Sequence, residues 1–530
     1  MPSFGRADVP RDARGWPQRS LGDLFAATVA RQPQQTALVD GLHRVTFGDL
    51  ERAAGEISAG LGALGVRAGD VVAYQLPNWW EAIAVFLATA RLGAIVNPLL
   101  PAFREAELRF TLAESGAKVL FIPGVLRGFD HRNAVASLRA GAPSLEHVVV
   151  CREADPGDFL PLRALEGGHL PLAAKVDPDS LLLLMYTSGT TSAPKGVLHT
   201  HNTLAAEILS LARVHALGPA DRTLMPSPVT HISGVIHAIL TPAILGTSAV
   251  LMDRWDAADA LARINAEGVT YMAGAPTFLQ EMLRQPRTRG DECSSLRLFS
   301  CGGANVSPEL VREARARFPA CIAKRVYGST EFPTISTTSP EDALSHGIET
   351  EGRAITPVEI RIVGEGVVAL RPGREGEVQA RGPECFVGYA DQSMNADAFS
   401  DDGWFRTGDL GVLDDEGYLR ITGRLKEIVV RKGEKISVRE VEEAVASHPA
   451  VAEAAVFAVP DANTGERAEV AIVLRAGAQL TLAELCEFLS RKGLARLKHP
   501  ERLHVLDALP RTESGKVARA ALLALLPSSH

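Results

Sequence analysis

The chain has 530 residues, of which 46% are hydrophobic and 22% are charged. Its length exceeds the roughly 250 to 300 residues at which a single hydrophobic core stops growing. At least two domains are therefore expected, and the formal net charge of -8 without long runs of one sign argues against a nucleic-acid-binding protein. The six cysteines lie far apart and form no CxxC pair, so the sequence suggests neither a zinc ribbon nor a disulfide framework, and a cytoplasmic location is expected.

The chain begins with "MPSFGRADVPRDARGWPQRS", which has no apolar run of the kind a secretory signal needs and favours a loosely held arm. From about Leu21 to Phe299, strand-like runs alternate with helical stretches. The strand-like runs include "DVVAYQL", "KVLFIPG", "LLLLMYT", "GVTYMAG" and "LRLFSCG", and the helical ones include "NWWEAIAVFLATARLG" and "AADALARINAEG". This alternation predicts mostly parallel sheets that are covered by helices.

One apolar segment, Ile232 to Met252, is about long enough to cross a bilayer and carries no formal charge. Pro242, Gly246 and the hydroxyl residues after them divide it into a buried helix and a short strand, "TSAVLM". No integral membrane span is therefore expected.

From about Pro357 the pattern changes to shorter β-like pieces, "VEIRIVG", "GEVQARG" and "GYLRITG", which predict a β-rich subdomain. A terminal unit with its own helix and strand pattern follows "TGRLKEIVV". The predicted fold is α/β, with an N-terminal domain over residues 1–424 built from two mostly parallel sheets, helices and the β-rich subdomain. Residues 425–530 are predicted to form a small α+β C-terminal domain.

The segment "YTSGTTSAPKGV", Tyr186 to Val197, begins like a phosphate-binding loop. A Walker loop has the pattern G-x-x-x-x-G-K-[ST], but here Pro194 and Gly196 occupy the places of the second glycine and the final hydroxyl. The hydroxyl residues lie before Lys195 instead. Exposed backbone N–H groups, several hydroxyls and one lysine suit a polyphosphate, and the competing interpretation is an ordinary Gly/Ser/Thr surface loop.

The order of these residues resembles the signature of the adenylate-forming superfamily, which comprises acyl-CoA synthetases, adenylation domains of peptide synthetases and luciferases. Further segments match the family's motifs in the family's order, from about Leu21 to the end of the chain. They are "PSPVTHISG" with His231, "CGGAN" at 301–305, "YGSTE" at 327–331, "WFRTGD" at 404–409, "GRLKE" at 423–427 and "PRTESGK" at 510–516. The resemblance implies that a carboxylate attacks the α-phosphorus of ATP and that pyrophosphate leaves.

The resemblance also assigns the phosphates and the metal. The β and γ phosphates would contact the loop residues Thr187, Ser188, Gly189, Thr190, Thr191 and Lys195. Thr330 and Glu331 would lie at the α-phosphate, and Mg²⁺ would be held by Glu331 and Thr187, a role that suits hard oxygen ligands. Read alone, Glu331 is equally well a surface acid.

Five further residues are implied to lie at the nucleoside. Tyr327 offers a flat face for adenine, and Gly303 and Ala304 leave room for a base or a substrate near the backbone. Asp409 would accept both ribose hydroxyls, with Arg424 as a second ribose contact. The alternatives are core packing for Tyr327 and a turn or capping role for Asp409.

His231 resembles the histidine that borders the acyl pocket of the family, and the alternative is a histidine simply packed beside an apolar helix. The tetrapeptide "HTHN", His199 to Asn202, raises the possibility of a metal site, but no third ligand is apparent. The metal interpretation is therefore disfavoured.

Lys516 has the clearest physical task. The substrate carboxylate and the α-phosphate must approach to roughly 4 Å, where their repulsion is on the order of 4 kcal/mol at an effective dielectric near 20, and a lysine between them offsets it. The family then rotates its C-terminal domain about a hinge that matches Lys426. After rotation the segment "RKGEKIS" would face the site, with Gly433 leaving room for the pantetheine arm of CoA. Its basic residues could contact the CoA phosphates, and the alternative is that they are only solvated; they are Arg431, Lys432 and Lys435.

Amino-acid-activating members carry an aspartate where this chain has Ile232, so an amino acid substrate is disfavoured. The segments "QLPNWW" and "NPLLPAFR" are similar to the branch that acts on medium-chain, alicyclic and aromatic acids. The prediction is an ATP-dependent carboxylic acid–CoA ligase that uses ATP, Mg²⁺ and coenzyme A, with a homodimer as a candidate assembly. The alternatives are an acyl-AMP ligase that loads a carrier protein, and a nucleotide-binding sensor without catalysis; a γ-phosphate kinase is disfavoured by the failed Walker pattern.

Overall fold

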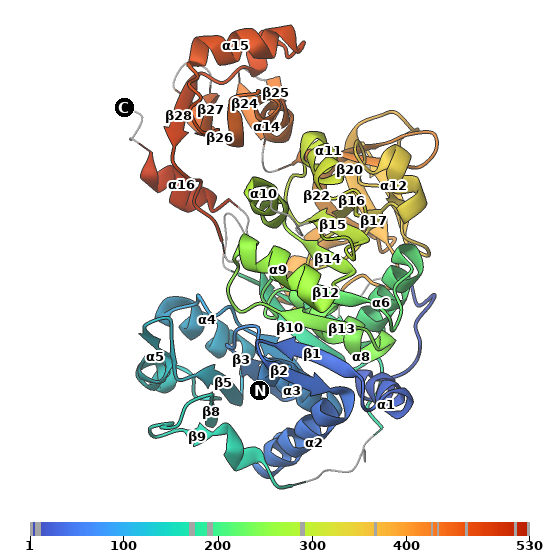
Figure 1. The fold of residues 1–530 in the computed structure, drawn as a ribbon, viewed down its shortest axis with the longest axis vertical. Coiled ribbons are helices and arrows are strands. Elements are labelled where there is room, and N and C mark those ends of the chain that lie inside the picture. Colours follow the sequence, from blue (N-terminus) through green and yellow to red (C-terminus); the bar gives the residue numbers. More distant parts are fainter. Residues whose placement is uncertain are drawn as a thin grey trace.

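The computed structural model describes residues 4–5, 12–168, 175–187, 194–286, 292–364, 368–425, 428–431, 434–461, 465–512 and 517–526. Figure 1 shows two large sheets with their helices, then a small antiparallel sheet, then a separate C-terminal unit at the top of the view. This arrangement confirms the predicted α/β fold.

The first large sheet has a parallel centre and antiparallel edges. Its strands run in the order β18-β17-β16-β15-β14-β12-β13-β1-β2, and the six from β16 to β1 are parallel. Their bounds are β1 Thr36–Asp40, β2 His43–Thr46, β12 Arg222–Met225, β13 Ser248–Leu251, β14 Tyr271–Gly274, β15 Leu298–Gly302, β16 Ile322–Tyr327, β17 Ser336–Thr337 and β18 Arg353–Ala354.

The second large sheet has the order β21-β11-β10-β4-β3-β5-β8-β9 and is parallel from β10 to β9. Its bounds are β3 Val71–Tyr74, β4 Ile95–Pro98, β5 Val119–Pro123, β8 His147–Cys151, β9 Leu160–Pro161, β10 Leu181–Thr187, β11 Lys195–Thr200 and β21 Gly388–Tyr389; a separate pair is β6 Val125–Leu126 with β7 Phe129–Asp130. Strand β11 returns antiparallel to β10, so Lys195 pairs with Thr187 at the end of the β10–β11 hairpin.

Helices cover both sheets and fill the space between them. Helix α3 is buried along residues 81–90, because it packs in a core that joins Leu38 of the first sheet with Val72 and Leu183 of the second. The helices are α1 Leu21–Arg31, α2 Phe47–Ala63, α3 Trp80–Arg91, α4 Glu105–Ser115, α5 His131–Leu138, α6 His201–His215, α7 Ile232–Gly234, α8 Thr241–Leu245, α9 Ala257–Glu267, α10 Pro276–Arg284, α11 Pro308–Arg317, α12 Pro340–His346 and α13 Asn395–Ala398; shorter turns are η1 Arg139–Gly141, η2 Leu162–Leu165, the π-helical η3 Val235–Leu240 and η4 Gln392–Met394.

The apolar segment Ile232 to Met252 is divided as predicted. Helices α7, η3 and α8 run together, and α8 ends where Gly246 adopts a φ of +78° before strand β13 begins. In the part of the chain that the structure describes, the helices are all too short or too polar to cross a membrane.

The β-rich subdomain is an antiparallel sheet in the order β19-β20-β22-β23. Its strands are β19 Glu359–Val363, β20 Gly376–Arg381, β22 Phe405–Leu413 and β23 Leu419–Arg424. It matches the change of pattern expected from about Pro357.

The C-terminal unit has its own sheet and core. It contains β24 Ile428–Arg431, β25 Glu434–Ser437, α14 Val438–Ala446, β26 Val451–Asp461, β27 Gly465–Leu474, α15 Leu482–Arg491, η5 Arg496–Lys498, β28 Arg502–Leu506 and α16 Arg519–Leu525. Val441, Val456 and Leu485 are among its buried residues. Arg439 reaches the N-terminal part of the chain, where its Nη2 lies 2.6 Å from Oε1 of Glu351.

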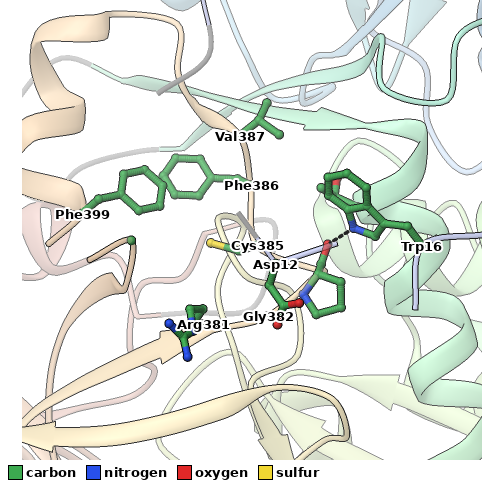
Figure 2. A pocket seen from close by; sticks show the side chains of 11 residues that line it. Asp12, Trp16, Arg381, Gly382, Cys385, Phe386, Val387 and Phe399 are labelled. Carbon is green, nitrogen blue, oxygen red and sulfur yellow. Dashed lines mark hydrogen bonds between the residues drawn. The ribbon is translucent and has the colours of Figure 1, made fainter. Parts of the chain in front are cut away.

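The described residues 12–20 differ from the loosely held arm that the sequence favours. The Trp16 indole donates to the Pro383 carbonyl at 2.9 Å, the Arg14 guanidinium pairs with Glu359 at 2.6 Å, and Gln18 N–H donates to Asn202. Figure 2 shows Trp16 beside the segment from Arg381 to Val387, where a cavity of about 20 Å³ has room for a single water molecule. This cavity is too small for a nucleotide, and it is lined by the segment that leads into β21 together with Trp16, Thr203 and Phe399.

Candidate active site

The predicted site residues of the first sheet follow the carboxyl ends of neighbouring parallel strands, where α/β proteins bind ligands. Strands β15 and β16 approach closely at this end, since a Cβ added to Gly302 would lie 2.4 Å from the Val326 carbonyl oxygen. Gly303 follows with a φ of +78°, and both Gly303 and Ala304 are exposed. The backbone at Gly303 and Ala304 is therefore exposed, and the predicted approach of a base or a substrate to it stays a prediction.

Thr330 and Glu331 lie in the turn between β16 and β17. The turn is closed by hydrogen bonds from Ile335 N–H to the Tyr327 carbonyl at 2.8 Å and from Ser329 N–H to the Phe332 carbonyl at 2.9 Å. Both residues are half-buried. The Glu331 carbonyl accepts from Phe386 N–H at 2.7 Å, so the turn is also held by the segment before β21.

Lys195 and Glu331 meet through a residue that the sequence analysis did not single out, Tyr389 of β21. The Tyr389 hydroxyl donates to Oε1 of Glu331 at 2.8 Å, and the Lys195 ammonium lies 4.9 Å from the centre of the Tyr389 ring. The Thr187 hydroxyl is 3.5 Å from the Lys195 carbonyl. Lys195, one of the predicted phosphate contacts, is therefore linked through Tyr389 to the turn that carries Glu331.

Asp409, Tyr327 and Arg424 form one hydrogen-bonded group. Oδ2 of Asp409 accepts from the Tyr327 hydroxyl at 2.7 Å, and its Oδ1 accepts from Nε of Arg424 at 2.6 Å. Strands β22 and β23 pair Asp409 directly with Arg424, which fixes this geometry. Burial, followed by the charge of Asp409, raises the pKa of Tyr327 well above its ordinary value, so its hydroxyl remains a donor.

His231 is the N-cap residue of α7. Its Nδ1 accepts from Ser233 N–H at 3.3 Å, and the side chain is half-buried. The aliphatic residues that follow, including Val235 and Ile236, belong to the buried core. The structure thus places His231 where a helix begins, and its predicted role at the acyl group stays a prediction.

Several predicted residues lie outside the described residues. They are Ser188, Gly189, Thr190, Thr191, Gly433 and Lys516, together with the predicted hinge residue Lys426. Arg431, expected near the phosphates of CoA, is described. Its guanidinium donates to the Leu497 carbonyl at 2.6 Å and pairs with Glu501 at 2.8 Å.

The two histidines of "HTHN" have separate hydrogen-bond partners. His199 lies between the Thr330 carbonyl and the Thr203 hydroxyl, and Nδ1 of His201 accepts from Leu21 N–H at 3.1 Å. Among the described residues there is no group of three or more His, Cys, Asp or Glu side chains that could hold a metal ion. The disfavoured metal interpretation of this tetrapeptide gains no support.

Glu331 and Thr187 nevertheless fit Mg²⁺ by the chemistry of their donors. A carboxylate and a hydroxyl are hard oxygen ligands, and Mg²⁺ is usually held by one or two carboxylates together with substrate phosphates and water. Such a site needs no dedicated cluster of protein ligands.

Comparison with known proteins shows the family of this chain. The family model described as "AMP-binding enzyme" matches residues 25–390, and the "AMP-binding enzyme C-terminal domain" matches residues 440–516. This chain belongs to the AMP-binding enzyme family. The two matches leave the β22–β23 hairpin and the start of the C-terminal sheet between them.

Relatives of this AMP-binding enzyme align over nearly the whole chain. A medium-chain fatty-acid–CoA ligase from Escherichia coli is 36% identical, covering 96% of this chain and 90% of its own length. A salicyl-AMP ligase/salicyl-S-ArCP synthetase from Mycobacterium tuberculosis is 34% identical, covering 98% and 93%. The crystal structure of ATP-bound MatB from Rhodopseudomonas palustris superposes with a TM-score of 0.85 at 27% identity, covering 94% of this chain and 98% of that one.

Proposed function

We propose that this AMP-binding enzyme is an ATP-dependent carboxylic acid–CoA ligase acting on a medium-chain, alicyclic or aromatic acid. It uses ATP and Mg²⁺ to form an acyl-AMP with release of pyrophosphate, and coenzyme A then takes the acyl group with release of AMP. The 36% identity to a medium-chain fatty-acid–CoA ligase over 96% of the chain supports this acid class and this acceptor.

The observation that carries the proposal is the connection between three groups of predicted residues. The Lys195 ammonium and the Glu331 carboxylate meet on Tyr389, and the Tyr327–Asp409–Arg424 group begins at the strand end from which the Thr330–Glu331 turn departs. A cation for a triphosphate, a carboxylate for a metal ion and an acceptor for the ribose hydroxyls therefore lie on neighbouring elements, as attack on an α-phosphorus requires.

Each residue has a physical task in the proposal. Lys195 offsets the charge of the departing pyrophosphate, and the Thr330–Glu331 turn presents a hydroxyl and a carboxylate at the α-phosphate. Mg²⁺, when bound, neutralises phosphate charge. Lys516 offsets the repulsion between the substrate carboxylate and the α-phosphate, and Gly433 gives the pantetheine arm of CoA room to pass. His231 borders the acyl group at the start of α7.

The experiment is ATP–pyrophosphate exchange with a panel of C2 to C12, cyclohexanecarboxylic and benzoic acids, followed by AMP release on addition of CoA. Exchange with members of the panel and AMP release with free CoA are expected. A panel without exchange, from protein that still binds ATP, would instead indicate a nucleotide-binding sensor, and release of ADP would indicate a kinase.

A second candidate acceptor is a carrier protein. The observation that favours it is the 34% identity to a salicyl-AMP ligase/salicyl-S-ArCP synthetase over 98% of the chain. The two candidates share the adenylation step and differ only in the thiol. Acyl transfer to free CoA, compared with transfer to a phosphopantetheinylated carrier, separates them.

We further propose a domain boundary between residues 424 and 425. Arg424 ends β23 of the N-terminal sheet, and Ile428 begins β24 of the C-terminal sheet, so the chain changes sheet within a few residues. A hinge here would let the C-terminal domain carry Lys516 to and from the site. A cytoplasmic location is part of the proposal, because the six cysteines lie far apart in the sequence, which does not favour the disulfide framework of a secreted protein. A homodimer stays a candidate assembly, and light scattering tests it.

A further inference from the structure

The turn that carries Thr330 and Glu331 is held by side chains from the second sheet. Its own hydrogen bonds close the turn but do not fix it against the phosphate-binding hairpin. Two side chains make that connection: His199, on β11, reaches the backbone of Thr330, and Tyr389, on β21, reaches the carboxylate of Glu331. Strands β11 and β21 are themselves paired, with Val197 opposite Tyr389.

The contact of His199 is fixed in its direction. Nε2 lies 2.8 Å from the Thr330 carbonyl oxygen, and a carbonyl oxygen can only accept, so Nε2 carries the proton. Nδ1 is then the acceptor, 3.1 Å from the Thr203 hydroxyl. The side chain is fully buried, and burial lowers the pKa of His199 to about 4, so the ring is neutral at pH 7 with its one proton on Nε2.

The other side of His199 is anchored in a helix N-terminus. Thr203 belongs to the capping box of α6, in which Thr200 N–H donates to the Thr203 hydroxyl at 3.0 Å and Thr203 N–H donates to the Thr200 hydroxyl at 3.2 Å. A continuous series of contacts therefore runs from the start of α6 through His199 to the Thr330 carbonyl. The same strand, β11, begins at Lys195.

We propose that His199 is a positioning residue for adenylation, which holds the Thr330 carbonyl so that Thr330 and Glu331 keep a fixed place relative to Lys195. Tyr389 does the same for the Glu331 side chain from β21. The inference rests on the proposed function, because it assigns its purpose to the turn at the α-phosphate. It also gives the "HTHN" segment a role that needs no metal.

Glutamine and asparagine at position 199 form a matched pair. The Gln Nε2 can take the place of the histidine Nε2 and donate to Thr330, whereas the shorter Asn amide reaches only the side facing Thr203. His199→Asn is expected to lower the kcat of ATP–pyrophosphate exchange about 10-fold, the loss typical of one buried hydrogen bond, and His199→Gln is expected to recover most of it. Tyr389→Phe, which keeps the ring beneath Lys195, is expected to raise the Mg²⁺ concentration for half-maximal exchange.

The second half-reaction distinguishes positioning from a loss of folded protein. Supplied acyl-AMP and CoA should give thioester at the wild-type rate in His199→Asn, since the pyrophosphate has already left. His201→Ala is the control for destabilisation: this buried histidine is two residues away and its Nδ1 accepts from Leu21 N–H, so its loss should lower the melting temperature without a selective loss of exchange.

The outcomes are separable from those of the proposed function. Wild-type protein that catalyses no exchange refutes the proposed function itself. If the wild type is active, three results would refute the positioning role alone. The first is a His199→Asn variant as active as the wild type, and the second is a His199→Gln variant that loses as much activity as His199→Asn. The third is a loss of both half-reactions together with a lower melting temperature.

Discussion

Replacing Glu384 with glutamine should make the protein more stable at alkaline pH and leave it unchanged in acid. Glu384 lies in the segment whose Phe386 N–H holds the Glu331 carbonyl, and its side chain is fully buried. The Ser210 hydroxyl donates to Oε1 at 2.6 Å, whereas Oε2 has no hydrogen-bond partner among the residues that the structure describes. Burial raises the pKa of Glu384 from 4.5 to about 7, and the nearby Asp12 adds to the increase while Arg213 opposes it.

The magnitude and sign follow from the difference in pKa between the folded and unfolded chain. Below pH 4.5 both states are protonated and the group contributes nothing to pH dependence. Between pH 4.5 and 7 the folded state binds more protons than the unfolded state, so stability falls as the pH rises. Above pH 7 the full cost is present, roughly 3 kcal/mol at about 1.4 kcal/mol for each unit of pKa.

Glutamine keeps the shape and an acceptor for Ser210 but does not titrate. The free energy of unfolding of Glu384→Gln minus that of the wild type should therefore rise by up to roughly 3 kcal/mol between pH 5 and 8.5. Denaturant unfolding of the two proteins at a series of pH values measures it, with the exposed Glu166→Gln as a control that should show no trend. A flat difference across this range would refute a buried, protonated Glu384.

Asp409→Asn should raise the KM for ATP about 10- to 100-fold, because each hydrogen bond to a charged group contributes about 1.5 to 3 kcal/mol. The kinetics of ATP–pyrophosphate exchange test this, with a variant of an exposed aspartate, Asp401→Asn, as the control. Lys195→Met should lower kcat/KM for ATP on the order of 100-fold or more, and an unchanged value would exclude a contact with the departing phosphates. Lys516→Ala should cut adenylation roughly 100- to 1,000-fold while sparing thioester formation from supplied acyl-AMP, and equal loss in both half-reactions would contradict its role. Arg439→Met removes one of the two guanidinium groups on Glu351, so limited proteolysis near residues 424–428 should quicken; unchanged cleavage would mean that Arg439 does not hold the two domains together.

The layered α/β architecture and the nucleotide chemistry could be predicted from the sequence. The expected run "LLLLMYT" is strand β10, and "AADALARINAEG" contains helix α9, because long apolar periodicities are set by local residue order. The change of pattern after Pro357 likewise predicted the antiparallel sheet from β19 to β23. Glycines and hydroxyls before Lys195 indicated a phosphate loop without any knowledge of what lies opposite it.

Contacts between distant segments were decided only by the tertiary structure. His199 was conspicuous as half of a possible metal pair, yet its partner is a carbonyl 131 residues away. The contact of Tyr389 could not be predicted from the sequence, because the residues next to a tyrosine in a short strand do not indicate that its hydroxyl will bond to Glu331. The local order of residues determines which segments form strands, helices and loops. The pairing of β11 with β21 and the position of the Thr330–Glu331 turn depend instead on how the two sheets pack. That packing brings His199 and Tyr389 to the turn.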